Sequence, residues 1–192
     1  MIIEGIEDPE DKDFIITYTG KRFHPLEPRW EDIDILDIAH QLAAINRFSG
    51  STRRPYSVAQ HSYFVSFLSN EHPLQGLLHD GSEAYLGDVP SPLKRHAIYT
   101  GYRQAETVLQ NMIYEKYGVR PGDKFEDVRL ADCTMCVVEG CNLMPMVDGS
   151  YWTKHRKEVH ESLTAWPADL AEEMFLRRFE SLTKENVLRV AF

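Results

Sequence analysis

A short stretch of the chain concentrates side chains that bind metal ions or move protons. Within ten residues it places His79, Asp80, Glu83 and Asp88, directly after a pair of leucines. Ionisable groups beside apolar residues are costly unless something compensates their charge. No lysine or arginine lies in residues 71–93 to form salt bridges with them. The composition of this stretch therefore favours a metal cation as the compensating charge.

Two further segments contribute similar groups beside apolar stripes. His61 shares three- and four-residue spacing with Val58 and Val65, so on a helix it points inward. A buried histidine taken alone is more often a hydrogen-bonded core residue than a ligand. Asp132 lies on a stripe with Met135, where a lone aspartate is more often a hydrogen-bond acceptor between helices. Each observation is ambiguous by itself, and the combination is what favours a metal site.

Together the three segments supply two imidazoles and two carboxylates: His61, His79, Asp80 and Asp132. Such a set suits Zn, Mn, Fe, Co or Ni, and does not suit Ca alone. A divalent ion with an open position lowers the pKa of a bound water. Glu83, which we expect one helical turn after His79 on the same face, could orient or deprotonate that water.

The order H…HD…D resembles the signature of the HD-domain metal-dependent phosphohydrolases. The segment HDGSEAYLGDVPSPLK, residues 79–94, resembles the corresponding part of bacterial 5′-deoxynucleotidases. The segment INRFSGSTRRPYSVAQHS, residues 45–62, is similar to the stretch before the first histidine in phage dATP triphosphohydrolases. The resemblance covers about residues 14–145. It implies an all-α HD-domain helical bundle that assembles as a dimer or larger homo-oligomer.

The resemblance also implies a role for each matching residue. The four residues named above would be the metal ligands, and Glu83 would position the attacking water. Asp88 would assist proton handling or hold a second divalent ion, and Lys94 would contact the substrate phosphate. Arg47 and Phe48 match an Arg-Trp pair whose arginine meets phosphate and whose tryptophan packs on the sugar and disfavours a 2′-hydroxyl. The Phe in place of Trp leaves the sugar preference open.

From this we expect a metal-dependent phosphohydrolase that acts on deoxynucleotides at the 5′ (α) phosphate. The phage-like segment favours a dNTP triphosphohydrolase, and a 5′-deoxynucleotidase acting on dNMPs is the alternative. Hydrolysis of an alarmone, which would use the same ligands, also stays open. So do a nucleotide-sensing module without turnover and a protein-interaction domain in which the polar cluster is only structural.

Composition limits the possible partners and location. The 192 residues contain 21 Lys and Arg against 30 Asp and Glu, a formal net charge of −9, so a nucleic-acid partner is disfavoured. No apolar run approaches the roughly 18 residues of a membrane span, and the acidic N-terminus is unlike a secretory signal. Three cysteines favour a reducing cytoplasm, or the host cytoplasm if the protein is phage-encoded. Cys133 and Cys136 lack a second zinc knuckle, so we expect free thiols there and at Cys141.

The elements that must position these groups are predicted mainly from apolar periodicity. We expect one domain over residues 1–192, with residues 1–12 frayed and a β-hairpin over residues 13–25. Asp32 or Asp34 can cap the first helix, and Ser57 the second. Residues 148–160 read as a loop followed by a short helix. The main helices are predicted at 34–46, 57–70, 73–86, 101–117, 125–143 and 168–183.

Overall fold

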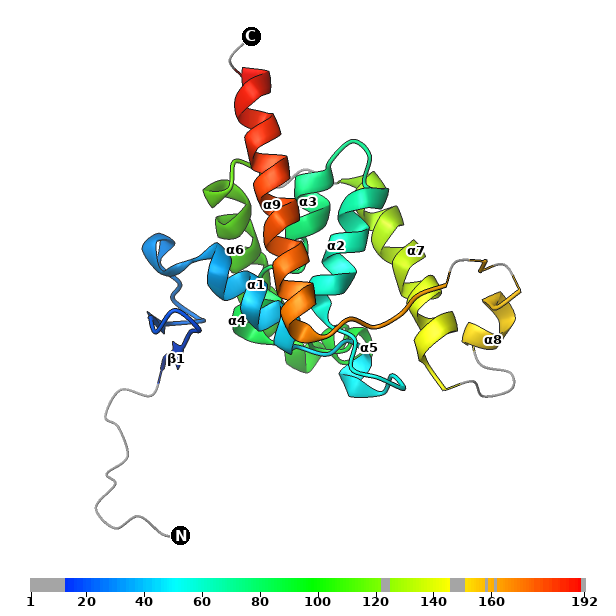
Figure 1. Cartoon of the computed structure of the whole chain (residues 1–192). Helices are drawn as coiled ribbons and strands as arrows, with labels where there is room; N and C mark the ends of the chain where they lie inside the picture. Colours follow the sequence, from blue (N-terminus) through cyan, green and yellow to red (C-terminus); the bar gives the residue numbers. More distant parts are fainter. Residues whose placement is uncertain (1–12, 122–124, 146–150, 158, 161, 191–192) are drawn as a thin grey trace.

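The computed structural model is mostly helical, with a two-stranded antiparallel hairpin near the N-terminus (Figure 1). This confirms the all-α fold class and the small hairpin expected from the sequence. The expected fraying of residues 1–12 lies outside the described residues. The structure describes residues 13–121, 125–145, 151–157, 159–160 and 162–190.

The hairpin consists of β1 (Ile15–Ile16) and β2 (Arg22–Phe23). Ile15 pairs with Phe23, whose ring is fully buried in the main core. Gly20, with φ of 82°, adopts the left-handed backbone that the connecting turn requires. The hairpin is thereby anchored to the helices through one aromatic side chain.

The helices follow in chain order, interrupted by three short 3-10 turns, η1 (Trp30–Asp32), η2 (Phe48–Gly50) and η3 (Ala97–Tyr99). Asp34 caps the first helix by accepting from the backbone N–H of Leu36, and Ser57 caps the second by accepting from that of Gln60. The helices are α1 (Ile35–Ala44), α2 (Val58–Leu68), α3 (Pro73–Leu78), α4 (Glu83–Leu86), α5 (Ser91–Lys94), α6 (Thr100–Lys116), α7 (Glu126–Leu143), α8 (Tyr151–His155) and α9 (Ala168–Val190).

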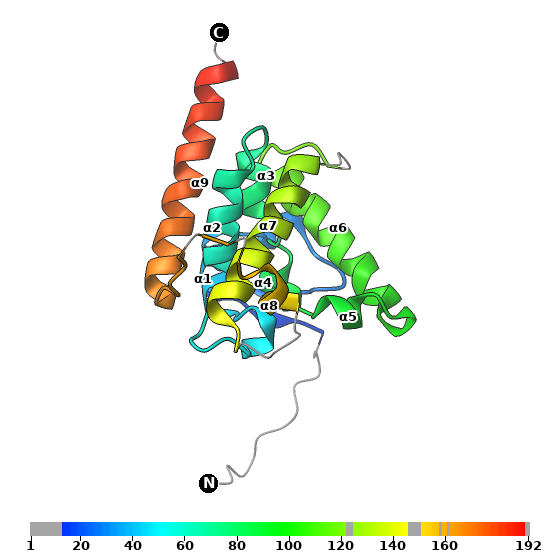
Figure 2. The same ribbon diagram turned by 90° about the vertical axis from the view of Figure 1, so that its right-hand side faces the viewer.

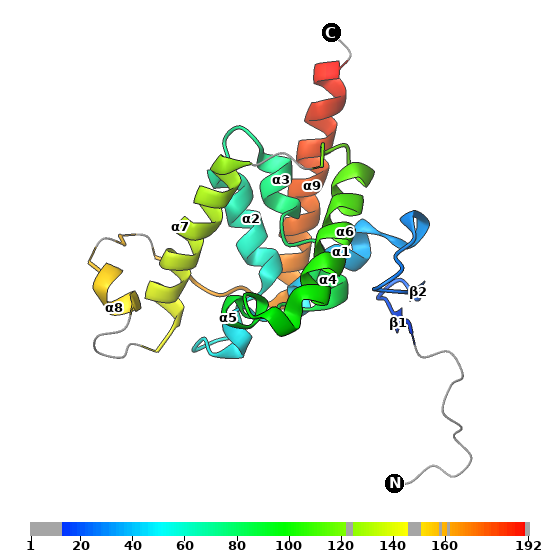
Figure 3. The ribbon, with the colours of Figure 1, turned by 180° about the vertical axis from the view of Figure 1, so that it is seen from behind.

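Helix α2 occupies the centre of the bundle. It packs against α1, α3, α7 and α9, and the last two flank it in Figures 1 and 2. Seen from behind in Figure 3, α6 lies beside α3, and α5 packs against α6. Because α2 is surrounded by other helices, a polar side chain on its inner face must find partners inside the protein.

The predicted single helix over residues 73–86 is wrong, because the chain forms α3 and α4 with a tight turn between them. A continuous helix would join the N–H of Ser82 to the carbonyl of Leu78. The side chain of Gln110 on α6 takes both groups instead. Its Oε1 accepts from Ser82 N at 3.0 Å, and its Nε2 donates to Leu78 O at 2.7 Å. An amide inserted into the hydrogen-bond ladder breaks the helix at His79 and Asp80.

The other helices agree with the predictions to within a few residues at most boundaries. Helix α9 extends to Val190, beyond the predicted end at residue 183, since no glycine or proline follows Pro167. Helix α8 matches the short helix expected within residues 148–160, of which 148–150 and 158 lie outside the described residues. Among the described residues, no helix is both long enough and apolar enough to cross a membrane.

Candidate metal centre

His61 and His79 bring their rings to one point from two different segments. His61 is fully buried in the first turn of α2, and His79 directly follows the last residue of α3. Their Nε2 atoms lie 3.3 Å apart. His61 Nδ1 is 2.7 Å from a carboxylate oxygen of Glu139, and His79 Nδ1 is 2.8 Å from the carbonyl oxygen of Gly76. Carbonyl and ionised carboxylate oxygens only accept, so both Nδ1 atoms donate and both Nε2 atoms can serve as ligands.

Two carboxylates complete this convergence. Asp80 Oδ2 lies 3.2 Å from His79 Nε2 and 3.7 Å from His61 Nε2. Asp132 Oδ1, from α7, lies 3.2 Å from His61 Nε2 and 4.0 Å from His79 Nε2. Ligand atoms arranged tetrahedrally around an ion at about 2.1 Å stand about 3.4 Å apart. His61, His79 and Asp80 could therefore hold a metal ion, and Asp132 lies within 4.0 Å of both histidine Nε2 atoms.

The electrostatics of the cluster also suit a cation. Burial opposes the ionised form of Asp80, yet the charges of His79, His61 and Arg47 hold its pKa well below the usual range. Burial raises the pKa of Asp132, but its contacts with the two histidines lower the pKa by more, so the net shift is downward. Burial lowers the pKa of His79, but Asp80 and Asp132 outweigh that effect and raise it to about 9. When no metal is bound, His79 therefore carries a proton below about pH 9, and an ion at this place would displace it.

Glu83 lies beside the donors and is almost completely buried, with 5% of its surface exposed. Its Oε1 accepts from Lys94 Nζ at 3.0 Å, while its Oε2 has no hydrogen-bond partner in the described part of the chain. Burial raises the pKa of Glu83 to about 9, assisted by the charges of Asp80 and Asp88 and opposed by that of Lys94. An unpartnered buried oxygen at such a place is expected to meet a ligand or a water.

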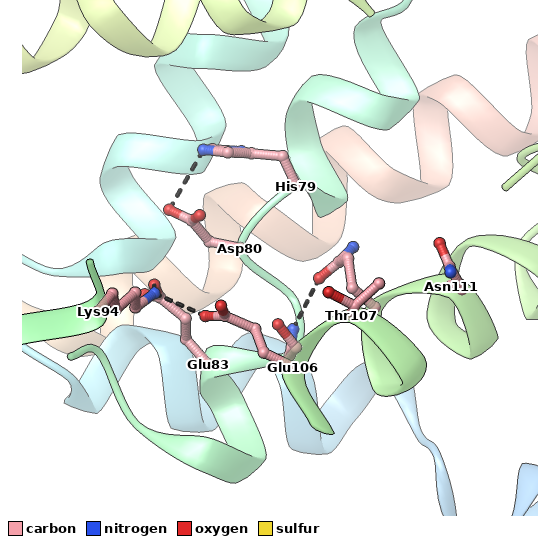
Figure 4. A pocket seen from close by; sticks show the side chains of 9 residues that line it. His79, Asp80, Glu83, Lys94, Glu106, Thr107 and Asn111 are labelled. Atoms are coloured by element: carbon pink, nitrogen blue, oxygen red, sulfur yellow. Dashed lines mark hydrogen bonds and ion pairs between the residues drawn. The ribbon is translucent and has the colours of Figure 1, made fainter. Parts of the chain in front are cut away.

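Three of these groups, His79, Asp80 and Glu83, line a polar cavity of about 330 Å³ (Figure 4), whereas His61 and Asp132 lie outside its lining. In Figure 4, His79 and Asp80 lie on the side away from α6, Glu83 and Lys94 lie toward one end, and Asn111 lies toward the other. The lining is His79, Asp80, Ser82, Glu83, Lys94, Glu106, Thr107, Gln110 and Asn111. The cavity thus connects the candidate metal ligands to a hydrogen-bonding wall on α6.

The expectation that the acidic stretch has no cationic partner is wrong, because cations reach it from outside residues 71–93. Lys94 Nζ lies 3.0 Å from Glu83 Oε1 and 2.6 Å from Glu106 Oε1. Arg47 places a guanidinium nitrogen 3.5 Å from Asp80 Oδ2. The two residues predicted to bind the substrate phosphate, Arg47 and Lys94, are thus ion-paired in this structure. A metal site is therefore supported by the convergence of the donor atoms and not by a lack of nearby cations.

Phe48 and Asp88 lie near the centre but outside the cavity lining. The ring of Phe48 stands edge-on to that of Trp152, with 5.9 Å between the centroids. Phe48 and Ser49 have φ of 54° and 51°, two consecutive non-glycine residues in the left-handed region. Such backbone costs free energy and is concentrated at functional sites. Burial raises the pKa of Asp88, and the positive charge of Arg47 partly opposes that rise.

Comparison with known proteins identifies relatives of the chain. It is 36% identical over 176 residues to YfdR, an uncharacterized protein of Escherichia coli K12, and the match covers 89% of this chain and 96% of YfdR. The chain belongs to the YfdR family. It is also 38% identical over 111 residues to the uncharacterized protein RCAP_rcc00048 of Rhodobacter capsulatus, covering 53% of this chain and 56% of that protein. No established family model matches the sequence.

In this YfdR-family chain, three residues beside the centre were missed by the sequence reasoning. Glu139 is fully buried and carries a signal that could have revealed it, since it follows Asp132 by seven residues on the same helix face. Glu106 and Gln110 carry no such signal, because α6 meets the site only through tertiary packing.

The three cysteines of this YfdR-family chain form no disulfide bond among the described residues. Cys133 is exposed, Cys136 is half-buried and Cys141 is buried. In the described part of the chain, the only group of three or more potential metal ligands is the one formed by His61, His79 and Asp80. A metal role for the cysteines therefore receives no support from the described residues.

Proposed function

We propose that the chain is a metal-dependent phosphohydrolase that acts on deoxynucleotides at the 5′ (α) phosphate. One observation carries the proposal: four ligand atoms from three chain segments converge beside the unpartnered, buried Oε2 of Glu83. His61, His79 and Asp80 could hold a metal ion, and His79, Asp80 and Glu83 line the same polar cavity, so an acid or base would lie beside that ion. The resemblance of the same residues to the HD-domain phosphohydrolases supports this reading and supplies the deoxynucleotide class.

The metal would be held by His61, His79, Asp80 and Asp132. Two imidazoles and two carboxylates suit Zn, Mn, Fe, Co or Ni. A divalent ion bound there would polarise a phosphoryl oxygen and make water more acidic. The hydrogen bonds to the Nδ1 atoms of the histidines hold both rings in the orientation that such binding requires.

Glu83 would hold or accept the proton of the attacking water at Oε2. Lys94 occupies Oε1, so Oε2 is the atom that remains available. A carboxyl group whose pKa is raised to about 9 is a stronger base when ionised than an exposed glutamate. Its near-complete burial also fixes the side chain, so little ordering is needed when a substrate enters.

Lys94 and Arg47 would bind phosphoryl oxygens and compensate the charge that develops on them. Lys94 lines the cavity, and Arg47 touches Asp80 from the other side of the cluster. Substrate binding would exchange part of their contacts with carboxylates for contacts with phosphate. Arginine is especially suited to this role because its planar guanidinium can bind two oxygens at once.

The phage-like segment favours a triphosphate substrate, and one observation favours a monophosphate. Lys94 is the only lysine or arginine among the described residues that line the cavity, and two carboxylates already neutralise it. A triphosphate brings several negative charges, so a monophosphate needs less compensation at this place. The dNMP is therefore the second candidate, and one assay separates the two.

The test is a substrate panel with the purified protein supplemented separately with Mn, Co and Zn. The four dNMPs, the four dNTPs and the matching ribonucleotides are incubated and the products separated by chromatography. We expect release of either triphosphate or inorganic phosphate from deoxynucleotides, together with the nucleoside. Asp132→Asn serves as the matched variant, because a contaminating phosphatase would remain active in that preparation.

The opposite results are equally clear. Metal binding without turnover of any deoxynucleotide would overturn the proposal. If nucleotides then raised the melting temperature without product, the chain would be a sensing module. Activity confined to alarmones would change the proposed substrate class but leave the proposed metal ligands unchanged.

A further inference from the structure

Glu139 is a fully buried carboxylate to which no role has yet been given. It lies on α7, two helical turns after Asp132. Its Oε1 accepts from Tyr56 Oη at 2.9 Å and from His61 Nδ1 at 2.7 Å. Its Oε2 accepts from Arg47 Nε at 3.0 Å. Both oxygens are therefore occupied, and each faces a different functional side chain.

Glu139 is fully buried, and all three of its side-chain hydrogen bonds come from other side chains of the protein. A buried carboxylate with three donors stabilises the native state only while all three remain aligned. The positions of Tyr56, His61 and Arg47 around Glu139 are therefore fixed, because moving one of them would leave part of the buried carboxylate without its hydrogen bond.

The contact with Oε1 determines how His61 presents itself. Tyr56 and Arg47 both donate to Glu139, so its oxygens act as acceptors and His61 Nδ1 must carry the hydrogen. Nε2 is then the nitrogen left for the metal cluster, 3.2 Å from Asp132 Oδ1. A carboxylate behind a histidine ligand sets both the tautomer and the orientation of the ring.

The contact with Oε2 determines how Arg47 presents itself. Its Nε edge is directed to Glu139, and one terminal nitrogen lies 3.5 Å from Asp80 Oδ2. The guanidinium is planar, so fixing one edge fixes the direction of the others. The end of Arg47 that faces the metal cluster is therefore held by the same carboxylate that orients His61.

We propose that Glu139 is a positioning residue that orients His61 for the metal and Arg47 for the substrate phosphate, so that both functions depend on one carboxylate. The proposal rests on the proposed function of the site. It goes beyond it by naming a residue that touches neither metal nor substrate, and by coupling two binding events through that residue.

The first test is spectroscopic and needs no activity. The protein is labelled with ¹⁵N-histidine, and long-range ¹H–¹⁵N spectra are recorded for the metal-free and the Zn-loaded protein, with His61→Asn used for assignment. We expect a hydrogen on Nδ1 of His61 in the wild-type protein. A ring protonated at Nε2 alone would overturn the proposal, even if no Glu139 variant folds.

The second test replaces Glu139 by glutamine. An amide has one acceptor oxygen, so Glu139→Gln can keep the contact with His61 or with Arg47 but not both. We expect metal affinity, measured by chelator competition, or substrate KM to worsen about 10- to 100-fold. Glu139→Met, which removes both contacts, should worsen both. The matched control is Glu126→Gln, an exposed glutamate on the same helix.

The outcomes separate this inference from the proposed function. A folded Glu139→Gln protein with unchanged metal affinity and KM would overturn the positioning role, whatever the enzyme hydrolyses. If the wild-type chain turned over no nucleotide, the proposed function would fail. The Nδ1 hydrogen of His61 and its loss or shift in Glu139→Gln would then still decide whether the carboxylate orients the ring.

Discussion

Both histidines of the candidate metal centre are fixed from behind. His61 donates to Glu139 and His79 donates to the carbonyl of Gly76, so each ring presents Nε2 to the two aspartates. Four acceptor atoms within a few ångströms of one another repel unless protons or a cation lie between them. The donor atoms of the candidate centre are thus already in place without an ion, and a bound ion would displace the proton that His79 carries.

That replacement predicts the pH dependence of metal binding. Asp80 and Asp132 outweigh the effect of burial and raise the pKa of His79 to about 9 in the metal-free protein. Below about pH 9 the ring therefore carries a proton that the metal must displace, so metal affinity should rise as pH rises, by up to about tenfold per pH unit. Calorimetry in buffers of different ionisation enthalpy should detect the released proton. Affinity that is constant across neutral pH would contradict this assignment.

Glu83 should separate metal binding from chemistry. Glu83→Gln keeps the shape of the side chain but removes the base at Oε2, so kcat should fall roughly a hundredfold to ten-thousandfold. Metal affinity should change little, because Glu83 is outside the four ligands. Glu115→Gln, at an exposed position on α6, is the control. Equal losses of metal and activity would instead make Glu83 a ligand.

At this scale the sequence predicted the candidate ligands but not the contacts that hold them. His61, His79, Asp80 and Asp132 could be named because two imidazoles and two carboxylates beside apolar stripes favour a metal site, and the structure brings them together. The pairing of Lys94 with Glu83 was not predicted, because Lys94 lies just after the acidic stretch and was assigned to the substrate phosphate. Glu139 was missed although its seven-residue distance from Asp132 follows from helix geometry.

At the scale of the elements, the periodicity of apolar residues predicts the helices that pack by their own stripes. Helix α2 and helix α7 were predictable for this reason, with Val58, Val65 and Met135 buried as expected. The break between α3 and α4 was not, because its cause is the amide of Gln110, about thirty residues away. Apolar residues continue on both sides of the turn, so periodicity alone predicts one helix.

The break gives Gln110 an expected effect on the metal site. In Gln110→Glu the side chain can still accept from Ser82 N, but it can no longer donate to Leu78 O. We expect a loss of about 1–3 kcal/mol in unfolding free energy and weaker metal binding, because His79 follows Leu78 directly. Urea denaturation and chelator titration measure the two effects. Gln104→Glu, exposed on the same helix, should leave both unchanged, and an unaffected Gln110→Glu protein would disprove the account of the break.

Helix α8 depends on a small residue of α7. A Cβ added at Gly140 would overlap Trp152 Cε3, so the indole must move away. Gly140→Ala should therefore cost about 1–3 kcal/mol and change tryptophan fluorescence. At Gly101 an added Cβ meets nothing, so Gly101→Ala should be neutral or slightly stabilising. Similar melting curves for the two variants would show that α8 does not rest on Gly140.

At the scale of the whole molecule, the candidate ligands link distant parts of the chain. They come from α2, the turn after α3, and α7, so only the folded chain can assemble them. A metal that binds only the native state stabilises it, by about 2.7 kcal/mol when free metal is roughly a hundred times its Kd. Adding Mn or Co to the metal-free protein should therefore raise Tm, and a chelator should reverse the rise. Asp132→Asn should show a smaller rise, and an equal one would place the ion elsewhere.

The consecutive left-handed residues Phe48 and Ser49 have a consequence for how this fold tolerates change. Each is held in its conformation by the surrounding packing and would relax if that packing were lost. The conformation of this loop therefore depends on its neighbours. Arg47 lies at one end of the loop, and the ring contact between Phe48 and Trp152 holds it in place. Substitutions in α8 that weaken this ring contact can therefore change the position of Arg47 without altering any residue that touches the metal cluster.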